Sequence, residues 1–494
     1  MLTVRSGLIA SSLAMLTEIS RRMIGIVSLI ILARILSPED YGLVAIAMLF
    51  INFISVISDT GGRGYLMSRG EISDELVMTN WTINFLLRGL LATCLAIASI
   101  PIAHYYDDSR LIPIILVCSF QIVLGTLSSP GMVYKYKNQE LGAITTWNII
   151  SRFVTTGITI AIAIIYETYW ALVIGQVLVT FSGFLASYTI APMLPKFCLT
   201  GFRSQLNFSK WILLQSIVSY FRSQIDAIFV SAAFPKAIMG AYNSMRYYAM
   251  IPATMVVSPA VSQLLTQFSQ FKDNKTYLQK QIQVVLVTLS IVCAPVVYVM
   301  VTHEVFLVGF VLGEKWVEYS SLLAIFSLQT LIMSFNRLLT TIIMLKDKTR
   351  LLFVYSVVST LLQCFLFFSV DFESIYQLGV YKISLDLIAA AAFFMLVVWT
   401  MLGKSAFSPL LLPMIPAGVF IYVMHLGVSS VLPPVTNFGT FVLQVSAVGS
   451  GFLLANYALM WLLKDRVHCY GYLYKLILKF FRLCWEKLPL RPKA

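Results

Sequence analysis

Long apolar runs separated by short polar connections constrain the fold of this chain more than any other feature. A helix needs about 20 mostly apolar residues to cross the hydrocarbon core of a bilayer. Read with that window, the 494 residues contain predicted spans at 13–36, 41–60, 80–103, 111–131, 141–165, 168–191, 209–233, 238–267, 280–302, 318–344, 350–370, 374–401, 407–428 and 437–463. Charged residues make up only 12% of the chain, against about a quarter in soluble domains. We therefore expect an all-α integral membrane protein with about 14 transmembrane helices.

Lysine and arginine concentrate in alternate connections. Of the 35 such residues, 23 lie in or within two residues of the N-terminus, the even-numbered connections and the C-terminal tail. The odd-numbered connections and the span ends within two residues of them hold only Arg34, Arg110, Lys236 and Lys315. Cytoplasmic loops carry the excess of positive charge, so both termini are predicted to be cytoplasmic. The net charge of +13 then reflects membrane orientation, and no nucleic-acid partner is expected.

Two similar hairpins indicate an internal repeat. "LSPEDYGLVAIA" (36–47) joins the first two spans, and "FPKAIMGAYNSM" (234–245) joins the seventh and eighth. Repeats of six spans point the same way, which predicts two lobes with a substrate site between them. The predicted parts are an N-lobe at 1–191, a cytoplasmic linker at 192–208, a C-lobe at 209–401, two extra spans at 402–463, and a basic cytoplasmic tail at 464–494 that we expect to form an interfacial helix.

Charged side chains inside the spans are the candidate binding residues. The cations are Arg21, Arg22, Arg88, Arg152, Arg222, Arg246, Arg337 and Lys382, and the acids are Glu18, Asp226 and Asp386. The spacing of Glu18–Arg22, Arg222–Asp226 and Lys382–Asp386 is i,i+4, which permits local pairing. A lipid-facing arginine at mid-depth costs about 2.5–3.5 kcal/mol or more. The presence of several arginines without such an acid therefore indicates that they face a shared hydrated cavity. The expected ligand of such a cavity is anionic, such as a phosphate. The alternative is that individual side chains cap carbonyls or reach the interface.

Signs of enzymatic chemistry are weak. No nucleophile–base constellation emerges, and the scattered cysteines match no metal-ligand spacing, so we expect no enzyme activity, metal or cofactor. "YYDD" (105–108) resembles a metal-binding acidic pair, but it lies in a short outer connection and is interpreted as a solvated turn.

Four segments carry a family resemblance: "LARILSPEDYGLVAIA" (32–47), "SDTGGRGYLMSRGEIS" (58–73), "MGAYNSMRYYAMIP" (239–252) and "VLGEKWVEYSSLL" (311–323). On these segments the chain resembles the Wzx-type polysaccharide flippases, similar to colanic-acid exporters, of the multidrug/oligosaccharidyl-lipid/polysaccharide exporter superfamily. The resemblance implies two six-helix lobes around a central cavity. It also implies that undecaprenyl-diphosphate-linked oligosaccharide moves from the inner to the outer leaflet of the bacterial cytoplasmic membrane. Its implied partners are this glycan lipid, the bilayer, and a polymerase with other polysaccharide-assembly proteins.

The resulting hypothesis places the diphosphate on the intramembrane arginines and makes Glu18, Asp226 and Asp386 candidates for proton or sodium coupling. Three alternatives stay open. A peptidoglycan-precursor flippase would need a similar cationic cavity. A drug or cation antiporter of the same superfamily would need an acidic one. A membrane glycan polymerase would need a larger outer loop than this chain has.

Overall fold

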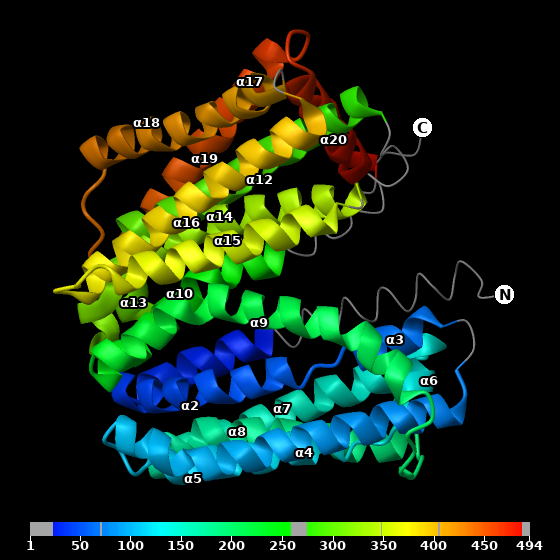
Figure 1. The fold of residues 1–494 in the computed structure, drawn as a ribbon. Helices are drawn as coiled ribbons and strands as arrows, with labels where there is room; N and C mark the ends of the chain where they lie inside the picture. Colours follow the sequence, from blue (N-terminus) through cyan, green and yellow to red (C-terminus); the bar gives the residue numbers. More distant parts are fainter. Residues whose placement is uncertain (1–22, 70–71, 258–273, 347, 404–405, 487–494) are drawn as a thin grey trace. The chain divides into compact units, whose positions relative to one another are not determined.

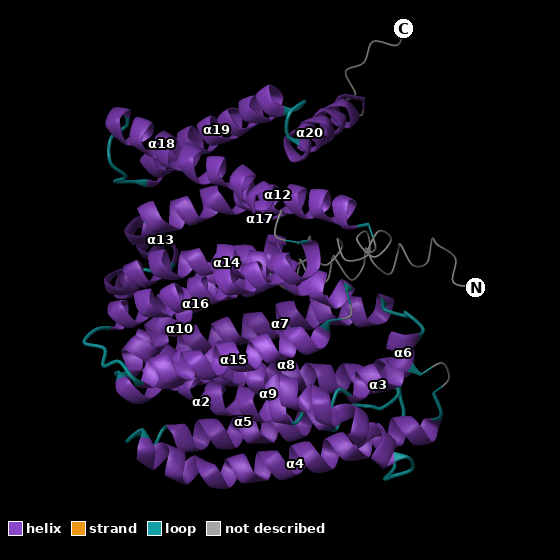
Figure 2. Cartoon of the chain, turned by 45° about the horizontal axis from the view of Figure 1, so that its top comes forward, coloured by secondary structure: helices purple, strands orange, loops and turns teal. Residues whose placement is uncertain are grey.

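The computed structural model describes residues 23–69, 72–257, 274–346, 348–403 and 406–486. Figure 2 shows helices joined by loops, with no strand among these residues. By packing, the chain divides into two compact units. Unit 1 comprises residues 1–244, 311–317 and 356–375, and unit 2 comprises residues 245–310, 318–355 and 376–494. The predicted lobes at 1–191 and 209–401 stay a prediction.

Unit 1 contains the first half of the chain (Figure 1). Its helices are Met23–Ile35, α2 (Pro38–Ile57), α3 (Gly62–Ser68), α4 (Asp74–Tyr105), α5 (Leu111–Thr126), α6 (Met132–Lys137), α7 (Gly142–Tyr166), α8 (Trp170–Ile190) and α9 (Phe202–Ala233). Helix α10 (Lys236–Pro252) begins in this unit. The helices α2, α4, α5 and α9 pack against one another, and α7 packs on α8.

Unit 2 contains most of the second half. Its elements are the π-helix Ala253–Val257, α12 (Lys275–Thr302), most of α13 (Glu304–Val311), α14 (Ser320–Leu345), the start of α15 (Thr349–Phe368), α16 (Ile375–Val397), the π-helix Val398–Leu402, α17 (Phe407–Leu411), α18 (Ile415–Val431), α19 (Phe438–Leu463) and α20 (His468–Glu486). A 3₁₀ turn, Glu314–Tyr319, precedes α14, and another, Leu412–Met414, joins α17 to α18. Helix α12 packs on α14, α18 and α20.

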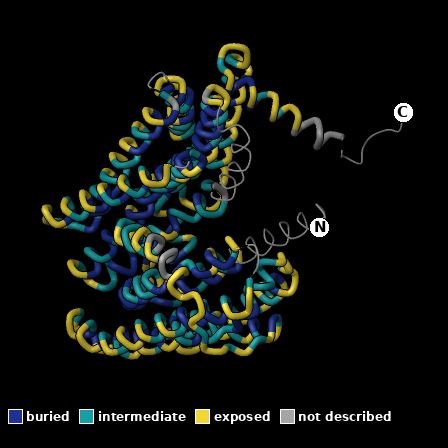
Figure 3. The backbone as a smooth tube through the Cα atoms, turned by 45° about the vertical axis from the view of Figure 1, so that its right-hand side comes forward, coloured by how far each residue is buried: buried dark blue, intermediate teal, exposed yellow. Residues whose placement is uncertain are grey.

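A helix coincides with each of the 14 predicted spans wherever the structure describes them. Within the described residues, ten helices are long and apolar enough to cross a membrane, and two shorter apolar helices, Met23–Ile35 and Leu111–Thr126, add to them. Exposed and buried residues alternate along the same helices (Figure 3), and many exposed residues are large and apolar, as expected for helices that face lipid. The all-α membrane architecture is confirmed, and the total of 14 spans is consistent with it.

Local sequence explains where several of these helices begin. Ser37 caps α2 in a capping box with Asp40, and Pro38 occupies the first helical position, where a missing N–H costs nothing. Asn437 and Thr440 form a capping box at the start of α19. The predicted interfacial helix of the tail corresponds to α20, whose buried residues Cys469, Tyr470 and Leu473 pack in one cluster with Val287 and Met460. Its place at a membrane surface stays a prediction.

Candidate functional site

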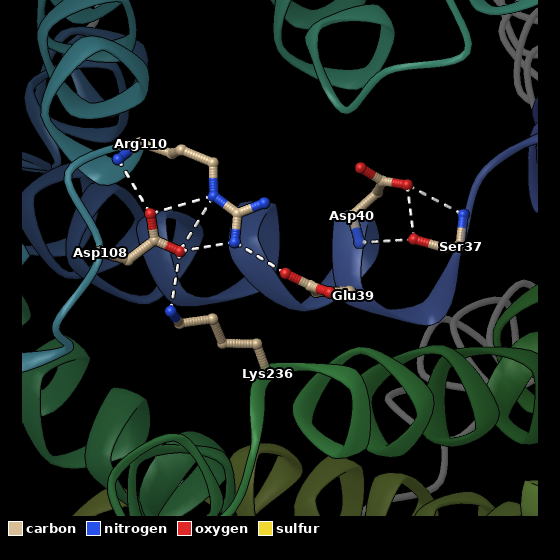
Figure 4. A network of polar contacts seen from close by, with 6 residues as sticks. All are labelled: Ser37, Glu39, Asp40, Asp108, Arg110 and Lys236. Carbon is tan, nitrogen blue, oxygen red and sulfur yellow. Dashed lines mark hydrogen bonds and ion pairs between the residues drawn. The ribbon is translucent and has the colours of Figure 1, made fainter.

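A network of charged side chains joins three helix ends of unit 1, on the side that the sequence analysis assigned to the exterior (Figure 4). Asp108 lies at its centre and is only 9% exposed. The Asp108 carboxylate accepts hydrogen bonds from Arg110 Nη2 and from Lys236 Nζ, both at 2.7 Å. Arg110 also donates to Glu39 Oε1 at 2.7 Å. The network therefore connects the start of α2, the α4–α5 turn and the start of α10.

The backbone places each of these side chains. Asp107 adopts a left-handed conformation with φ +49°, which ends α4 and turns the chain toward α5. The N–H of Arg110 then donates to Asp108 Oδ1 at 2.9 Å, so this turn holds its own carboxylate. Lys236 is the first residue of α10 and follows Pro235, which cannot continue a preceding helix.

The charges of the network stabilise one another. Burial alone would raise the pKa of Asp108, but the hydrogen bonds from Arg110 and Lys236 outweigh it and hold the pKa of its carboxyl well below its usual range. Hydrogen bonds to Asp108 and Glu39 raise the pKa of the Arg110 guanidinium. Asp108 and Arg110 are therefore both ionised at physiological pH. The interpretation of "YYDD" as a solvated turn describes the exposed Asp107, but it is wrong for Asp108.

The two repeated hairpins touch backbone to backbone beside this network. A Cβ atom built on Gly42 would lie 1.8 Å from the carbonyl oxygen of Lys236, and one built on Gly240 would lie 1.9 Å from the carbonyl oxygen of Pro38. The contact is reciprocal, because each glycine lies one turn into its helix and faces the first residue of the other helix. Only glycine fits at either position, which gives a physical reason for the glycine in both hairpin segments.

The "GEKW" segment contacts the first hairpin from within the same unit. Trp316 is fully buried, and its Nε1 donates to the carbonyl oxygen of Ala33 at 2.7 Å. Lys315 Nζ donates to the carbonyl oxygen of Ile35 at 3.0 Å. The Trp316 ring also meets the Tyr41 ring edge to face, with centroids 5.2 Å apart.

We call this assembly the outer cap and define it by residues 33–42, 108–110, 236–240 and 311–316. It contains all four cations that the sequence analysis placed in the outer connections, since Arg34 Nε donates to the carbonyl oxygen of Val311 at 3.3 Å. A pocket of about 680 Å³ adjoins it. That pocket is lined in part by Glu39, Tyr105, Asp107 and Lys236.

Three predicted site residues of unit 1 lie on separate helices. Arg88 on α4 and Arg152 on α7 are half-buried. The Nη2 atom of Arg152 lies 3.5 Å from a Cβ built on Gly25, which places this guanidinium against the helix Met23–Ile35. Arg222 on α9 is also half-buried, and its Nη1 donates to Ser356 Oγ at 3.4 Å.

The acid four residues after Arg222 has a different hydrogen-bond partner. Asp226 is fully buried, and its Oδ2 accepts a hydrogen bond from Tyr242 Oη at 2.8 Å. This bond ties α9 to α10 within unit 1.

Unit 2 contains the intramembrane ion pair that the sequence spacing predicts. Lys382 is 3% exposed, and its Nζ lies 2.8 Å from Asp386 Oδ1. Gln329 on α14 donates to the other carboxylate oxygen at 3.3 Å. The same unit contains Arg246, half-buried on α10, and Arg337, exposed on α14.

The remaining predicted site residues, Glu18, Arg21 and Arg22, lie outside the described residues. The other arginines are divided between the two units, so their convergence on one cavity stays a prediction. Among the described residues, no group of three or more His, Cys, Asp and Glu side chains is placed to hold a metal ion.

Comparison with known proteins identifies the family. The family model for "polysaccharide biosynthesis protein" matches residues 31–321, more than half of the chain. The chain belongs to this family of polysaccharide biosynthesis proteins. The matched region contains both hairpins and the "GEKW" segment, so the outer cap is built largely from the segments by which the chain resembles the polysaccharide flippases.

Curated relatives of this polysaccharide biosynthesis protein agree with that assignment. It is 21% identical to the lipopolysaccharide biosynthesis protein WzxC of Escherichia coli over 69% of this chain and 70% of the relative. It is 22% identical to the succinoglycan biosynthesis transport protein ExoT of Rhizobium meliloti, over 54% of this chain and 55% of the relative.

A solved structure shows the same fold. The lipid II flippase MurJ in an inward closed conformation superposes with a TM-score of 0.72 at 14% identity, and the match covers 91% of this chain and 99% of that one. At this identity the similarity establishes the fold alone. Together these comparisons confirm the resemblance to the polysaccharide flippases of the exporter superfamily.

Proposed function

We propose that this protein moves undecaprenyl-diphosphate-linked oligosaccharide repeat units from the inner to the outer leaflet of the bacterial cytoplasmic membrane. The product would serve the synthesis of a surface polysaccharide. The observation that carries the proposal is the family match over residues 31–321. The names of the relatives, which include a polysaccharide transport protein, and the flippase-like fold support it.

We assign the diphosphate to the arginines inside the membrane-spanning helices. Arg88, Arg152 and Arg222 are half-buried on three helices of unit 1, and a half-buried guanidinium within an apolar helix favours a polar counterpart over lipid. Arginine binds phosphate oxygens in a bidentate manner, whereas the lipid tail can stay in the bilayer. Arg21, Arg22, Arg246, Arg337 and Lys382 complete the proposed set.

Lys382 and Asp386 have a narrower role in this scheme. The two side chains neutralise each other at 2.8 Å. A proton or sodium ion that binds Asp386 must first displace the Lys382 ammonium, so coupling through Asp386 requires this ion pair to open. By the same reasoning, Lys382 is available to a diphosphate only if the ion pair opens.

Transport would follow from alternating exposure of the cavity to the two sides. The proposed orientation has both termini in the cytoplasm, and the protein needs neither a cofactor nor catalysis. Exchange between two states only equilibrates the glycan lipid, so net transport requires either ion coupling or consumption of the glycan by a polymerase outside.

The rival transport functions predict different cavities. A drug or cation antiporter needs a cavity lined by acids, and the charges inside these spans are mostly basic. The similarity to the peptidoglycan-precursor flippase concerns the fold and does not extend to the substrate. The relatives named for polysaccharide synthesis favour a polysaccharide repeat unit over a peptidoglycan precursor.

The test uses cells that lack this protein and the polysaccharide polymerase, so that single lipid-linked repeat units accumulate. Periodate added to intact spheroplasts oxidises only glycans in the outer leaflet. We expect oxidation when the protein is expressed and protection when it is absent. Equal oxidation in both strains would contradict the proposal. A polymerase function is excluded by the same result, because the loss of a polymerase leaves single units exposed.

The arginine assignment has its own test in these cells. We expect Arg152→Ala and Arg337→Ala to abolish glycan exposure without lowering the amount of protein in the membrane. Arg466→Ala, at an exposed position after α19, is the matched control and should export normally. Normal export by both cavity variants would contradict the docking role.

A further inference from the structure

The outer cap joins segments that the sequence assigns to different lobes. Residues 33–42 and 108–110 belong to the predicted N-lobe, whereas residues 236–240 and 311–316 belong to the predicted C-lobe. We propose that the outer cap is the gate that closes the transport path on the extracytoplasmic side and opens each time a glycan leaves. This inference rests on the proposed function, because a protein that releases a glycan outside must separate its lobes there.

The glycine contact has the properties of a reversible closure. Gly42 and Gly240 bring the first turns of α2 and α10 into backbone contact, as small residues do between membrane helices. The atoms nearest to each glycine belong to the backbone of the other helix, so this contact can open without a change of side-chain rotamer at either glycine. The same geometry leaves no opening between these turns when they meet.

The ion pairs are arranged so that separation leaves no buried charge without a partner. Lys236 Nζ contacts Asp108 from the other predicted lobe. Arg110 contacts the same carboxylate from its own turn, at 2.7 Å, and stays with it when Lys236 moves away. The side chains of Arg110 and Glu39 are 42% and 53% exposed, and both residues belong to the predicted N-lobe, so this pair is not broken when the lobes separate. Opening therefore breaks the Lys236–Asp108 pair, whose side chains are 23% and 6% exposed, and Asp108 keeps Arg110 as its partner.

Trp316 supplies a fully buried aromatic contact of the closed gate. Its indole is fully buried, and its N–H donates to the carbonyl oxygen of Ala33. Breaking this contact exposes a large aromatic surface. The closed state is therefore favoured in the absence of substrate. Binding of the transported glycan, or the rearrangement that it causes, must offset the free-energy cost of exposing the Trp316 ring.

A reversible cross-link tests the gate. Asp108→Cys and Lys236→Cys are combined in a protein whose native cysteines have been replaced, and a bis-methanethiosulfonate reagent joins the two thiols. We expect the cross-link to lower glycan exposure at least tenfold in the spheroplast assay, and dithiothreitol to restore it. The control pair is Val431→Cys with Thr436→Cys, two exposed positions at the α18–α19 turn outside the outer cap, and the reagent should leave its transport unchanged.

The outcomes separate this inference from the proposed function. If the uncross-linked protein exports glycan and the cross-linked Asp108/Lys236 pair exports at the same rate, the gate is wrong and the flippase function stands. If no form of the protein exposes glycan, the proposed function fails.

Should the cysteine-replaced protein not fold, Trp316→Cys labelled by a membrane-impermeant maleimide is the second measurement. Labelling must then increase severalfold when substrate is present, and unchanged labelling would overturn the gate.

Discussion

Lys236 Nζ lies 2.7 Å from Asp108 Oδ2, although the two residues are 128 positions apart in the chain. The pair joins the start of α10 to the α4–α5 turn, next to the contact between Gly42 and Gly240. The two hairpins, which are similar in sequence, thus contact each other at the glycine that lies one turn into each helix.

The glycine contact should not tolerate a methyl group. We expect Gly42→Ala and Gly240→Ala each to lower the stability of the detergent-solubilised protein by about 1–3 kcal/mol, the usual cost of overpacking, because the added Cβ would clash with a backbone carbonyl. The measurement is the midpoint of thermal unfolding. Gly89→Ala is the control, since a Cβ at Gly89 meets nothing within 4 Å, and its midpoint should stay the same or rise. Equal effects at all three glycines would contradict the close contact.

The indole N–H of Trp316 should contribute to the stability of the protein in addition to the packing of the ring. Trp316→Phe keeps most of the aromatic packing but leaves the carbonyl of Ala33 without its donor, which costs about 1–3 kcal/mol in a buried site. We expect a lower unfolding midpoint in detergent than for wild-type protein. Trp461→Phe, at a position that is 52% exposed, is the matched control. A midpoint no lower than that of this control would show that the hydrogen bond contributes nothing.

The outer cap should be insensitive to pH over the physiological range. The pKa of Asp108 is held below its unfolded value, near 4, by Arg110 and Lys236. Its contribution to stability is therefore fully present above about pH 4 and is lost only as the pH falls through the lower, folded pKa. The difference in unfolding midpoint between wild-type and Asp108→Asn protein should be constant from pH 5 to 8. A difference that disappears between pH 7 and 5 would contradict this ionic arrangement.

The buried pair in unit 2 should show strong coupling between its members. Lys382→Met leaves Asp386 buried without its cation, and removal of one partner of a buried pair costs about 3–5 kcal/mol. We expect the double variant Lys382→Met/Asp386→Leu to be more stable than Lys382→Met alone, because it removes both charges. Thermal unfolding of the two single variants and the double variant gives the coupling energy. Additive effects would mean that the two charges do not depend on each other.

Much of the architecture was predictable because its causes are local. A run of about 20 apolar residues defines a span wherever it occurs, and the i,i+4 spacing of Lys382 and Asp386 was enough to predict their pairing. The same spacing did not determine the contacts of Arg222 and Asp226, which bond to Ser356 and Tyr242 instead. Those partners come from tertiary packing, which a helix-face argument does not include.

The outer cap could not be predicted because its contacts are distant in sequence. Asp108 looked solvated in a short outer turn, since nothing nearby in the sequence indicates that Lys236 reaches it. Trp316 and Ala33 are separated by 283 positions. One signal was nevertheless present: the outer connections are poor in lysine and arginine, so the few cations that occur there needed a specific reason. The structure gives all four a partner.

Flipping by the protein alone can be measured after reconstitution. Purified protein in liposomes is given a fluorescent undecaprenyl-diphosphate oligosaccharide, and a membrane-impermeant quencher reports the fraction in each leaflet. We expect wild-type protein to make nearly all of the label accessible within minutes, whereas Arg152→Ala should leave the inner-leaflet half protected. Protection of that half by wild-type protein, to the same extent as in protein-free liposomes, would contradict the proposed function.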